Sequence, residues 1–355
     1  MALLEVRDLR VQFETPDGVV QAVNGIDFDV HAGETLAVVG ESGAGKSQLV
    51  MAIMGLLAEN GSATGKAEFE GRDLMQMSAK ELNRIRGRQI AMIFQDPMTS
   101  LNPFLTIEKQ MTEVVMHHQG LRKDEARAHA VEMLRAVRIP DPEERVKQYP
   151  HEYSGGMRQR VMIAMGLLCE PDLLIADEPS TALDVTVQAQ ITQLVGELRD
   201  KSNMSVILIT HDLAVVAEIC DRIIVMYAGE MVETGTVEDI FYRPRHPYTQ
   251  GLLASVPRLD RLSDDDLHAI PGNPPNLLDL PTGCRFRDRC EKAAEVCRQV
   301  PPLQVLDDGC MSRCFIDMKS GDMKSGDMKS GEILSVAEIP SADDAGDEPV
   351  AEGRE

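Results

Sequence analysis

The sequence contains no long hydrophobic run. A membrane-spanning helix needs roughly 18 or more apolar residues in succession, whereas the most apolar stretch here, residues 161–168, is far shorter and contains Gly166. Residues 1–10 carry Glu5, Arg7 and Asp8 where a signal peptide would need an apolar block. We therefore expect a cytosolic chain that contacts a membrane only through a partner.

Basic residues are also scarce. The 36 Lys and Arg side chains are outnumbered by 58 Asp and Glu side chains, which gives a net charge of -22 at pH 7. A field of this sign repels nucleic-acid backbones over the surface as a whole, although a local basic patch is compatible with it. We therefore expect no nucleic-acid partner.

The chain is long and apolar enough for more than one folded domain. Its 355 residues exceed the roughly 100–200 of a typical domain, and a hydrophobic content of 43% excludes wholesale disorder. The end of the chain differs, because residues 317–331 repeat Asp-Met-Lys-Ser-Gly three times before an acidic segment. Such repeats cannot bury enough apolar surface to offset their ordering entropy. Residues 317–355 are therefore predicted to form a disordered acidic tail.

Alternating strand-like and helix-like segments predict an α/β fold with a largely parallel sheet. Short apolar runs bounded by polar or Gly residues predict buried strands, at residues 36–39, 90–94, 173–176, 206–210 and 223–226. Residues 4–13 and 19–30 alternate around a turn, as antiparallel strands do. The chain turns helical between residues 97 and 153, for example over 123–138, and shifts to Pro, Arg and Cys after about residue 241.

One segment matches the phosphate-loop pattern G-x-x-x-x-G-K-S/T. It follows the strand at residues 36–39, opens a helical run over 46–57, and reads Gly40-Glu41-Ser42-Gly43-Ala44-Gly45-Lys46-Ser47. The glycines let several backbone N–H groups and a helix N-terminus point at one anion. Lys46 is predicted to contact the β and γ phosphates of a nucleotide, and Ser47 to offer its hydroxyl oxygen to Mg²⁺.

Two carboxylates follow the buried strand at residues 173–176. Asp177 at this position is suited to hold Mg²⁺ through water, and Glu178 to polarise the water that attacks the γ phosphorus. An acidic helix cap after a strand is the plain alternative, but the phosphate loop favours the catalytic interpretation.

A second helix-N-terminal anion site is predicted at Ser154, Gly155 and Gly156, before a helix expected to begin at Arg158. One triphosphate does not need two such sites from one chain. At this point the sequence resembles the ATP-binding-cassette ATPases, whose signature loop this is and whose two subunits close head to tail over two ATP molecules. Met157 stands where that signature commonly has Gln.

The resemblance implies further roles. Gln95 would sense the nucleotide and couple to membrane subunits, the loop at residues 180–184 would cross the dimer interface, and His211 would contact the γ phosphate. Phe13 is either a core residue or the aromatic that stacks on adenine. Carried onto this sequence, the catalytic residues are Glu178, His211 and Lys46, and the Mg²⁺ ligands are Ser47, Gln95 and Asp177. The ATP contacts are Phe13, Gly40, Ser42, Gly43, Gly45, Lys46, Ser47, Gln48, Gln95, Asp177, Ser154, Gly155 and Gly156.

The fold implied by the resemblance is a P-loop NTPase cassette over residues 1–240. It would combine a parallel RecA-like core, an antiparallel β subdomain and a helical subdomain at about residues 97–157. A small Cys-rich C-terminal domain over residues 241–316 would follow.

Motifs outside the nucleotide loops resemble the oligopeptide/dipeptide importer ATPases, a group that also includes nickel importers. They are Gln95-Asp96-Pro97-Met98-Thr99-Ser100-Leu101-Asn102-Pro103, Arg245-His246-Pro247-Tyr248-Thr249 and Leu252-Leu253-Ala254-Ser255-Val256-Pro257. The resemblance implies a peripheral ATPase at the cytoplasmic face of the inner or cell membrane that powers import of oligopeptides or dipeptides. Its partners would be a second, homologous ATPase in a heterodimer, two transmembrane permeases and, through them, an extracytoplasmic peptide-binding protein.

Two other functions stay open at this point. A nickel importer ATPase would share nearly every motif. A soluble cassette ATPase acting on nucleic acid or the ribosome is a different class, which the single phosphate loop and the charge of -22 disfavour.

The seven cysteines fall into two groups. Cys169 and Cys220 lie in apolar helical surroundings and are expected to be inert. The other five crowd into residues 284–314, where a reducing cytosol favours a metal or Fe–S site over disulfides, although the spacing is no standard ferredoxin or zinc pattern. The resemblance implies a 4Fe-4S cluster, against reduced structural thiols or zinc, with Cys310 left aside and the ligands Cys284, Cys290, Cys297 and Cys314.

Overall fold

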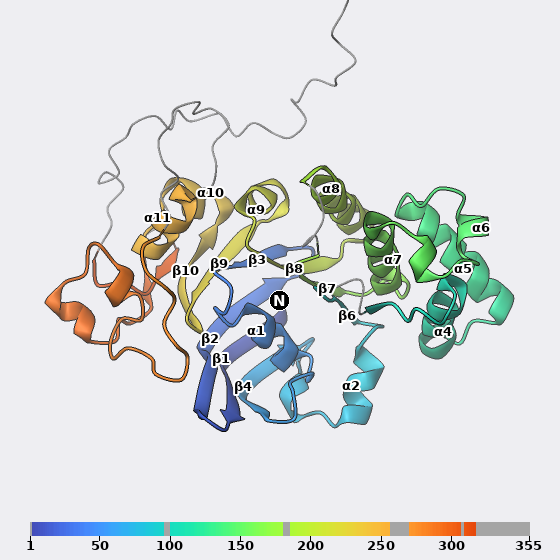
Figure 1. Cartoon of the computed structure of the whole chain (residues 1–355). Coiled ribbons are helices and arrows are strands. Elements are labelled where there is room, and N and C mark those ends of the chain that lie inside the picture. The colour runs from blue at the N-terminus through green and yellow to red at the C-terminus, as the bar shows by residue number, and fades with distance from the viewer. Residues whose placement is uncertain (1, 96–99, 180–184, 256–269, 307–308, 317–355) are drawn as a thin grey trace, which may run out of the picture. The chain divides into compact units, whose positions relative to one another are not determined.

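Figure 1 shows a computed structural model of the chain, which describes residues 2–95, 100–179, 185–255, 270–306 and 309–316. Several sequence predictions lie outside these ranges. They concern part of the motif after Gln95 (residues 96–99), the loop at 180–184, Val256 and Pro257, and the tail at 317–355.

The N-terminal strands form an antiparallel sheet in the order β2-β1-β4-β5. Its strands are β1 (Ala2–Thr15), β2 (Gly18–His31), β4 (Gly61–Phe69) and β5 (Arg72–Asp73). The apolar residues Leu4, Val6, Leu9 and Val11 of β1 are buried. Their alternation changes phase at a bulge between Val6 and Leu9, where the backbone register shifts. The predicted antiparallel pair is confirmed.

The second sheet has the order β11-β12-β10-β9-β3-β8-β7-β6. Its parallel part contains β3 (Thr35–Val39), β6 (Ile90–Ile93), β7 (Leu173–Asp177), β8 (Ser205–Thr210) and β9 (Arg222–Tyr227). All five predicted parallel strands are confirmed, and β3, β7 and β8 are buried throughout, as strands covered on both faces are. The antiparallel strands β10 (Glu230–Thr236), β12 (Met311–Ser312) and β11 (Gln304–Val305) extend one edge. Strands β11 and β12 belong to the Cys-rich segment (residues 241–316), which is therefore hydrogen-bonded to the cassette sheet through β10.

Helices cover the sheets in groups (Figure 1). Helix α1 (Lys46–Ile53) packs in the cluster of buried residues shared with the antiparallel sheet, near α2 (Ala79–Ile85). A second cluster includes residues of α4 (Ile107–Gln119), α5 (Lys123–Ala136), α7 (Gly155–Leu167) and α8 (Val185–Ser202), and the short α6 (Pro142–Arg145) contacts α5. A third includes α9 (Leu213–Ile219), α10 (Val237–Tyr242) and α11 (Pro247–Ala254). Short 3₁₀ turns are η1 (Leu74–Gln76), η2 (Pro150–Glu152), η3 (Arg287–Arg289) and η4 (Glu295–Arg298).

Two helix boundaries differ from the sequence prediction. Helix α7 begins at Gly155 and not at Arg158, because the Ser154 hydroxyl accepts a hydrogen bond from the Met157 N–H at 3.3 Å and caps the first turn. Helix α1 ends at Ile53 and does not continue to residue 57, since Gly55 adopts a positive φ of 61°. Among the helices in the described ranges, none combines the length and apolarity needed to cross a bilayer.

Candidate active site

The predicted phosphate loop connects β3 to α1 through a backbone path that requires glycine at two points. A Cβ at Gly40 (φ 152°) would lie 2.2 Å from the carbonyl oxygen of Met226, and one at Gly45 (φ 96°) would lie 2.2 Å from that of Ala22. Gly43 also has a positive φ of 80°, and its side is open. The chain therefore bends tightly enough to direct the unpaired N–H groups of the first turn of α1 toward the space above the loop.

Lys46 occupies the centre of this loop. Its side chain is buried, and its Nζ donates to the carbonyl oxygens of Gly40 at 2.7 Å and Glu41 at 3.0 Å. Burial lowers the pKa of Lys46, while the carboxylates of Glu178, Asp177 and Glu41 act in the opposite direction. The buried Lys46 ammonium, with carboxylates near it, is placed to exchange its two carbonyl contacts for contacts with phosphate oxygens.

Ser47 and Asp177 meet beneath the loop. The Ser47 hydroxyl donates to Asp177 Oδ1 at 3.1 Å, and Asp177, the last residue of β7, is 4% exposed. Burial raises the pKa of Asp177, an effect that the bond from Ser47 opposes. A hydroxyl and a buried carboxylate form the oxygen donor set that suits Mg²⁺. Gln48, half-buried, follows in the same turn of α1.

Glu178 lies at the junction of three strand ends. Gln95, after β6, donates from Nε2 to Glu178 Oε2 at 3.0 Å, and His211 Nδ1, after β8, lies 3.5 Å from Glu178 Oε1. Glu178 itself has a positive φ of 46°, and its N–H donates to the carbonyl oxygen of Ile209. A non-glycine residue in this region is strained, and such strain is concentrated at functional sites. The described hydrogen bonds of Gln95 lead to Glu178 and not to Ser47 or Asp177.

The loop containing Ser154 stands apart from the phosphate loop. Ser154 and Gly155 are exposed, Gly156 is half-buried, and the Ser154 hydroxyl is used within its own helix. Within the described ranges, these three residues form no hydrogen bond with residues 40–48. Phe13 is half-buried: its ring packs on the core and lies 2.6 Å from a Cβ placed at Gly61. The core interpretation of Phe13 is therefore consistent with its packing, while the adenine-stacking role stays a prediction.

Two contacts to the phosphate loop from distant residues were not anticipated from the sequence. Arg289 of η3 donates to both carboxylate oxygens of Glu41, and the Tyr248 hydroxyl accepts the Glu41 N–H at 2.8 Å. The contacts join positions 248 and 207 residues apart. No local sequence pattern predicts contacts between residues so far apart in the chain. The one sequence feature that pointed to Arg289 was its position next to Cys290.

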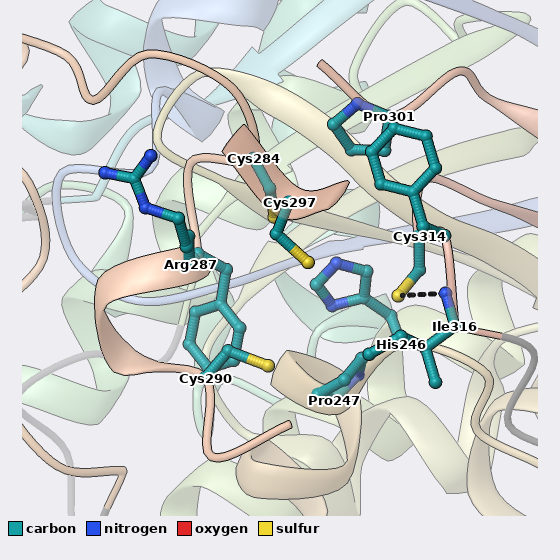
Figure 2. Close-up of a pocket in the computed structure, with 11 residues that line it drawn as sticks. His246, Pro247, Cys284, Arg287, Cys290, Cys297, Pro301, Cys314 and Ile316 are labelled. Atoms are coloured by element: carbon teal, nitrogen blue, oxygen red, sulfur yellow. Dashed lines mark hydrogen bonds between the residues drawn. The ribbon is translucent and has the colours of Figure 1, made fainter. Parts of the chain in front are cut away.

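The four predicted cluster cysteines line one pocket (Figure 2). The side chains of Cys290, Cys297 and Cys314 point to the space around the His246 ring, and Cys284 lies behind Cys297. Cys310 does not line this pocket; its Sγ lies beside Gly235. Burial raises the pKa of Cys284 to about 11 and also raises those of Cys290 and Cys314.

The pocket has room for little more than a water molecule. Its volume is about 10 Å³, close to the minimum for one water. Among the described residues, no group of three or more His, Cys, Asp or Glu side chains is arranged to hold a metal ion. The four thiols line one pocket, but in this arrangement the pocket is too small to hold a cluster.

Cys169 and Cys220 lie in apolar surroundings, as the sequence predicts. Cys169 is buried after α7, and Cys220 packs at the end of α9. Burial raises the pKa of Cys220 to about 12, which favours the protonated thiol at neutral pH.

Comparisons with known proteins bear on both halves of the chain. Residues 23–181 match the family described as ABC transporter, and residues 232–297 match the family described as oligopeptide/dipeptide transporter, C-terminal region. The chain is 58% identical over 313 residues to the oligopeptide transport ATP-binding protein OppD of Salmonella typhimurium, covering 88% of this chain and 93% of that protein. The chain belongs to the ATP-binding proteins of peptide ABC transporters.

A second relative and a solved structure are also similar to the chain. The dipeptide transport ATP-binding protein DppD of Bacillus subtilis is 55% identical over 306 residues, which cover 86% of this chain and 91% of that protein. A dimeric ATP-binding cassette, MJ0796, in a post-hydrolysis state bound to ADP and Pi is 25% identical with a TM-score of 0.60, covering 66% of this chain and 98% of that one. The cassette fold, ATP binding and ATP hydrolysis predicted from the sequence are confirmed by this membership. The nickel and soluble alternatives are not favoured.

Proposed function

We propose that this chain hydrolyses ATP to power the import of oligopeptides or dipeptides through a membrane transporter. The observation that carries the proposal is the meeting of Ser47 with Asp177, and of Gln95 and His211 with Glu178, at the carboxyl ends of adjacent parallel strands. Ligands of open α/β sheets bind at this edge. The relatives from Salmonella typhimurium and Bacillus subtilis are named for oligopeptide and dipeptide transport.

In the proposed mechanism, Lys46 leaves its two carbonyl contacts to hold the β and γ phosphates of ATP. Glu178 accepts the proton of the attacking water, Gln95 orients the Glu178 carboxylate, and His211 contacts the γ phosphate. Ser47, Asp177 and Gln95 would hold Mg²⁺, which when bound neutralises phosphate charge. Most of the rate enhancement comes from positioning and electrostatics, since phosphoryl transfer needs little covalent chemistry from the protein.

The exposed loop at Ser154, Gly155 and Gly156 is proposed to serve the ATP of a partner ATPase. Its hydroxyl and the N-terminus of α7 are open to solvent and separate from this chain's own phosphate loop. The dimeric cassette of similar fold supports this arrangement. We propose a heterodimer with a homologous second ATPase, two transmembrane permeases and delivery of peptide to them by an extracytoplasmic binding protein. Residues 1–240, including a helical part at 97–157, would be the cassette, residues 241–316 the Cys-rich domain, and residues 317–355 the tail.

Phe104 is the residue we propose for docking on a permease. It is 86% exposed, the most exposed large apolar side chain in the described ranges, and it lies between Gln95 and α4 in a turn where its N–H donates to Asn102 Oδ1. Docking would place the chain peripherally at the cytoplasmic face of the membrane.

Replacing Phe104 with Ser is expected to lower peptide uptake by the assembled transporter about tenfold, because a buried aromatic anchor would be lost from the docking surface. ATP binding by the isolated chain should stay unchanged. Uptake of labelled peptide into proteoliposomes or cells measures the effect. Val305→Ser, at a 73% exposed position of β11, is the matched control and should transport normally. Normal uptake by the Phe104 variant would contradict the docking site.

The Cys pocket is proposed to hold a 4Fe-4S cluster on Cys284, Cys290, Cys297 and Cys314. The support is that these four thiols, and not Cys310, share one pocket. Thiolates are the usual ligands of such clusters. When bound, a cluster would staple the Cys-rich segment or respond to redox state.

Anaerobically purified protein is expected to contain about four irons per chain and to absorb visible light. Cys297→Ser should lose most of the iron, whereas Cys310→Ser, which removes a buried thiol outside the pocket, should retain it. Metal analysis and absorption spectra measure both. Wild-type protein without iron or visible absorption would contradict the cluster, and stoichiometric zinc would replace it with the zinc alternative.

A further inference from the structure

The carboxylate of Glu41, in the phosphate loop, accepts two hydrogen bonds from an arginine of the Cys-rich segment. Arg289 Nη1 donates to Glu41 Oε2 at 2.6 Å, and Nη2 donates to Glu41 Oε1 at 2.9 Å. This two-bond geometry is the strongest form of Arg–carboxylate contact, because the guanidinium fork matches both oxygens. Arg289 therefore holds the Glu41 side chain in place and neutralises its negative charge.

Arg289 is itself held from several directions. It is only 9% exposed, its Nε donates to the Pro271 carbonyl oxygen at 2.9 Å, and Nη1 lies 3.3 Å from the Tyr227 hydroxyl. The guanidinium also lies 5.7 Å from the centre of the Tyr227 ring and 6.0 Å from that of Phe286. An arginine packed in this way has little freedom to leave Glu41.

The backbone of Glu41 is held by the same region. Its N–H donates to the Tyr248 hydroxyl at 2.8 Å, and Tyr248 is fully buried. The Tyr248 ring packs on Tyr227 and Phe286, with ring centres 4.6 and 5.4 Å away. Side chain and main chain of one phosphate-loop residue are thus both fixed by residues that follow the nucleotide-binding motifs in the sequence.

Glu41 needs this partner because of its charge. The Glu41 carbonyl oxygen accepts a hydrogen bond from Lys46 Nζ at 3.0 Å, and the Glu41 carboxylate acts electrostatically on the same ammonium. Glu41 therefore lies beside the position that phosphates would occupy. An unpaired carboxylate beside an anion-binding loop would repel a triphosphate. We infer that Arg289 is a positioning residue for ATP binding, which neutralises Glu41 and holds the phosphate loop in its binding conformation from the Cys-rich segment.

The turn that carries Arg289 connects this contact to the Cys pocket. The Arg287 N–H donates to the Cys284 carbonyl oxygen, and the Cys290 N–H donates to the Arg287 carbonyl oxygen, so η3 is braced between two pocket cysteines. The Cys-rich segment is thereby a structural part of the nucleotide site. This role depends on ATP binding by the family and not on which group, if any, the cysteines hold.

The test compares nucleotide affinities of full-length variants. Arg289→Met is expected to weaken ATP binding about tenfold and adenosine binding by less than about twofold, because the freed Glu41 carboxylate repels phosphate and not the base. Adding Glu41→Gln to Arg289→Met should recover most of the ATP affinity, since the repelling charge is then gone. Equilibrium binding of ATP, ADP and adenosine, with ADP intermediate, measures the series.

Arg287→Met is the matched control, because Arg287 lies in the same turn but pairs with the neighbouring Asp288; its ATP affinity should match wild type. The proposal is overturned if Arg289→Met binds ATP like wild type. It is also overturned if ATP and adenosine are weakened equally, or if Glu41→Gln gives no recovery, since a purely structural role predicts those results. Wild-type protein that binds no ATP would instead contradict the family function itself.

Discussion

Glu178→Gln is expected to lower ATP turnover of the assembled transporter by at least about 100-fold while ATP affinity stays within about twofold. The amide keeps the size of the carboxylate but cannot accept a proton from water. Gln95 and His211, which contact Glu178 at 3.0 and 3.5 Å, would keep neighbours of the same shape. The loss should therefore fall on the chemical step and leave binding intact.

Phosphate release and equilibrium ATP binding, measured on the same preparation, check this prediction. Glu170→Gln is a suitable control because Glu170 is exposed yet has a similar left-handed backbone, with φ 50° against 46° for Glu178. Near-normal turnover by the Glu178 variant would eliminate this carboxylate as the base. A matching loss in the Glu170 variant would show that the effect is not specific to the Glu178 carboxylate.

Lys46→Ala is expected to weaken ATP binding by about 100-fold or more, and turnover falls with it. Lys46 Nζ satisfies the carbonyl oxygens of Gly40 and Glu41 and lies among the carboxylates of Asp177 and Glu178. Without the ammonium, the loop would present carbonyl oxygens and acidic groups to an anionic ligand. The repulsion adds to the lost contact with the phosphates.

Titration with a fluorescent ATP analogue measures the affinity, and thermal unfolding shows whether the variant folds. Lys66→Ala removes an exposed ammonium of β4 that pairs with Glu68, and it should bind ATP normally. Retained affinity in the Lys46 variant would refute its role. The two largest effects are distinguishable, because one variant binds without turning over and the other fails to bind.

The local part of the site was predictable from the sequence. The phosphate loop lies between β3 and α1 as expected, since a buried apolar strand, glycines at strained positions and a following helix are adjacent in the chain. Asp177 and Glu178 follow β7 for the same reason. The start of α7 was misplaced, because a single serine cap, decided by one hydrogen bond to Met157, outweighs the reluctance of two glycines to join a helix.

The sequence by itself determined the strands, the phosphate loop and the family resemblance, because these depend on residues close together in the chain. Only the tertiary structure decided which distant side chains meet. The parallel order of β6, β7 and β8 brings Gln95, Glu178 and His211 to one edge. Packing of the Cys-rich segment joins Arg289 to Glu41 across 248 residues. Such a pair leaves no periodicity or spacing in the sequence, since it forms only when two separately specified segments are buried against each other.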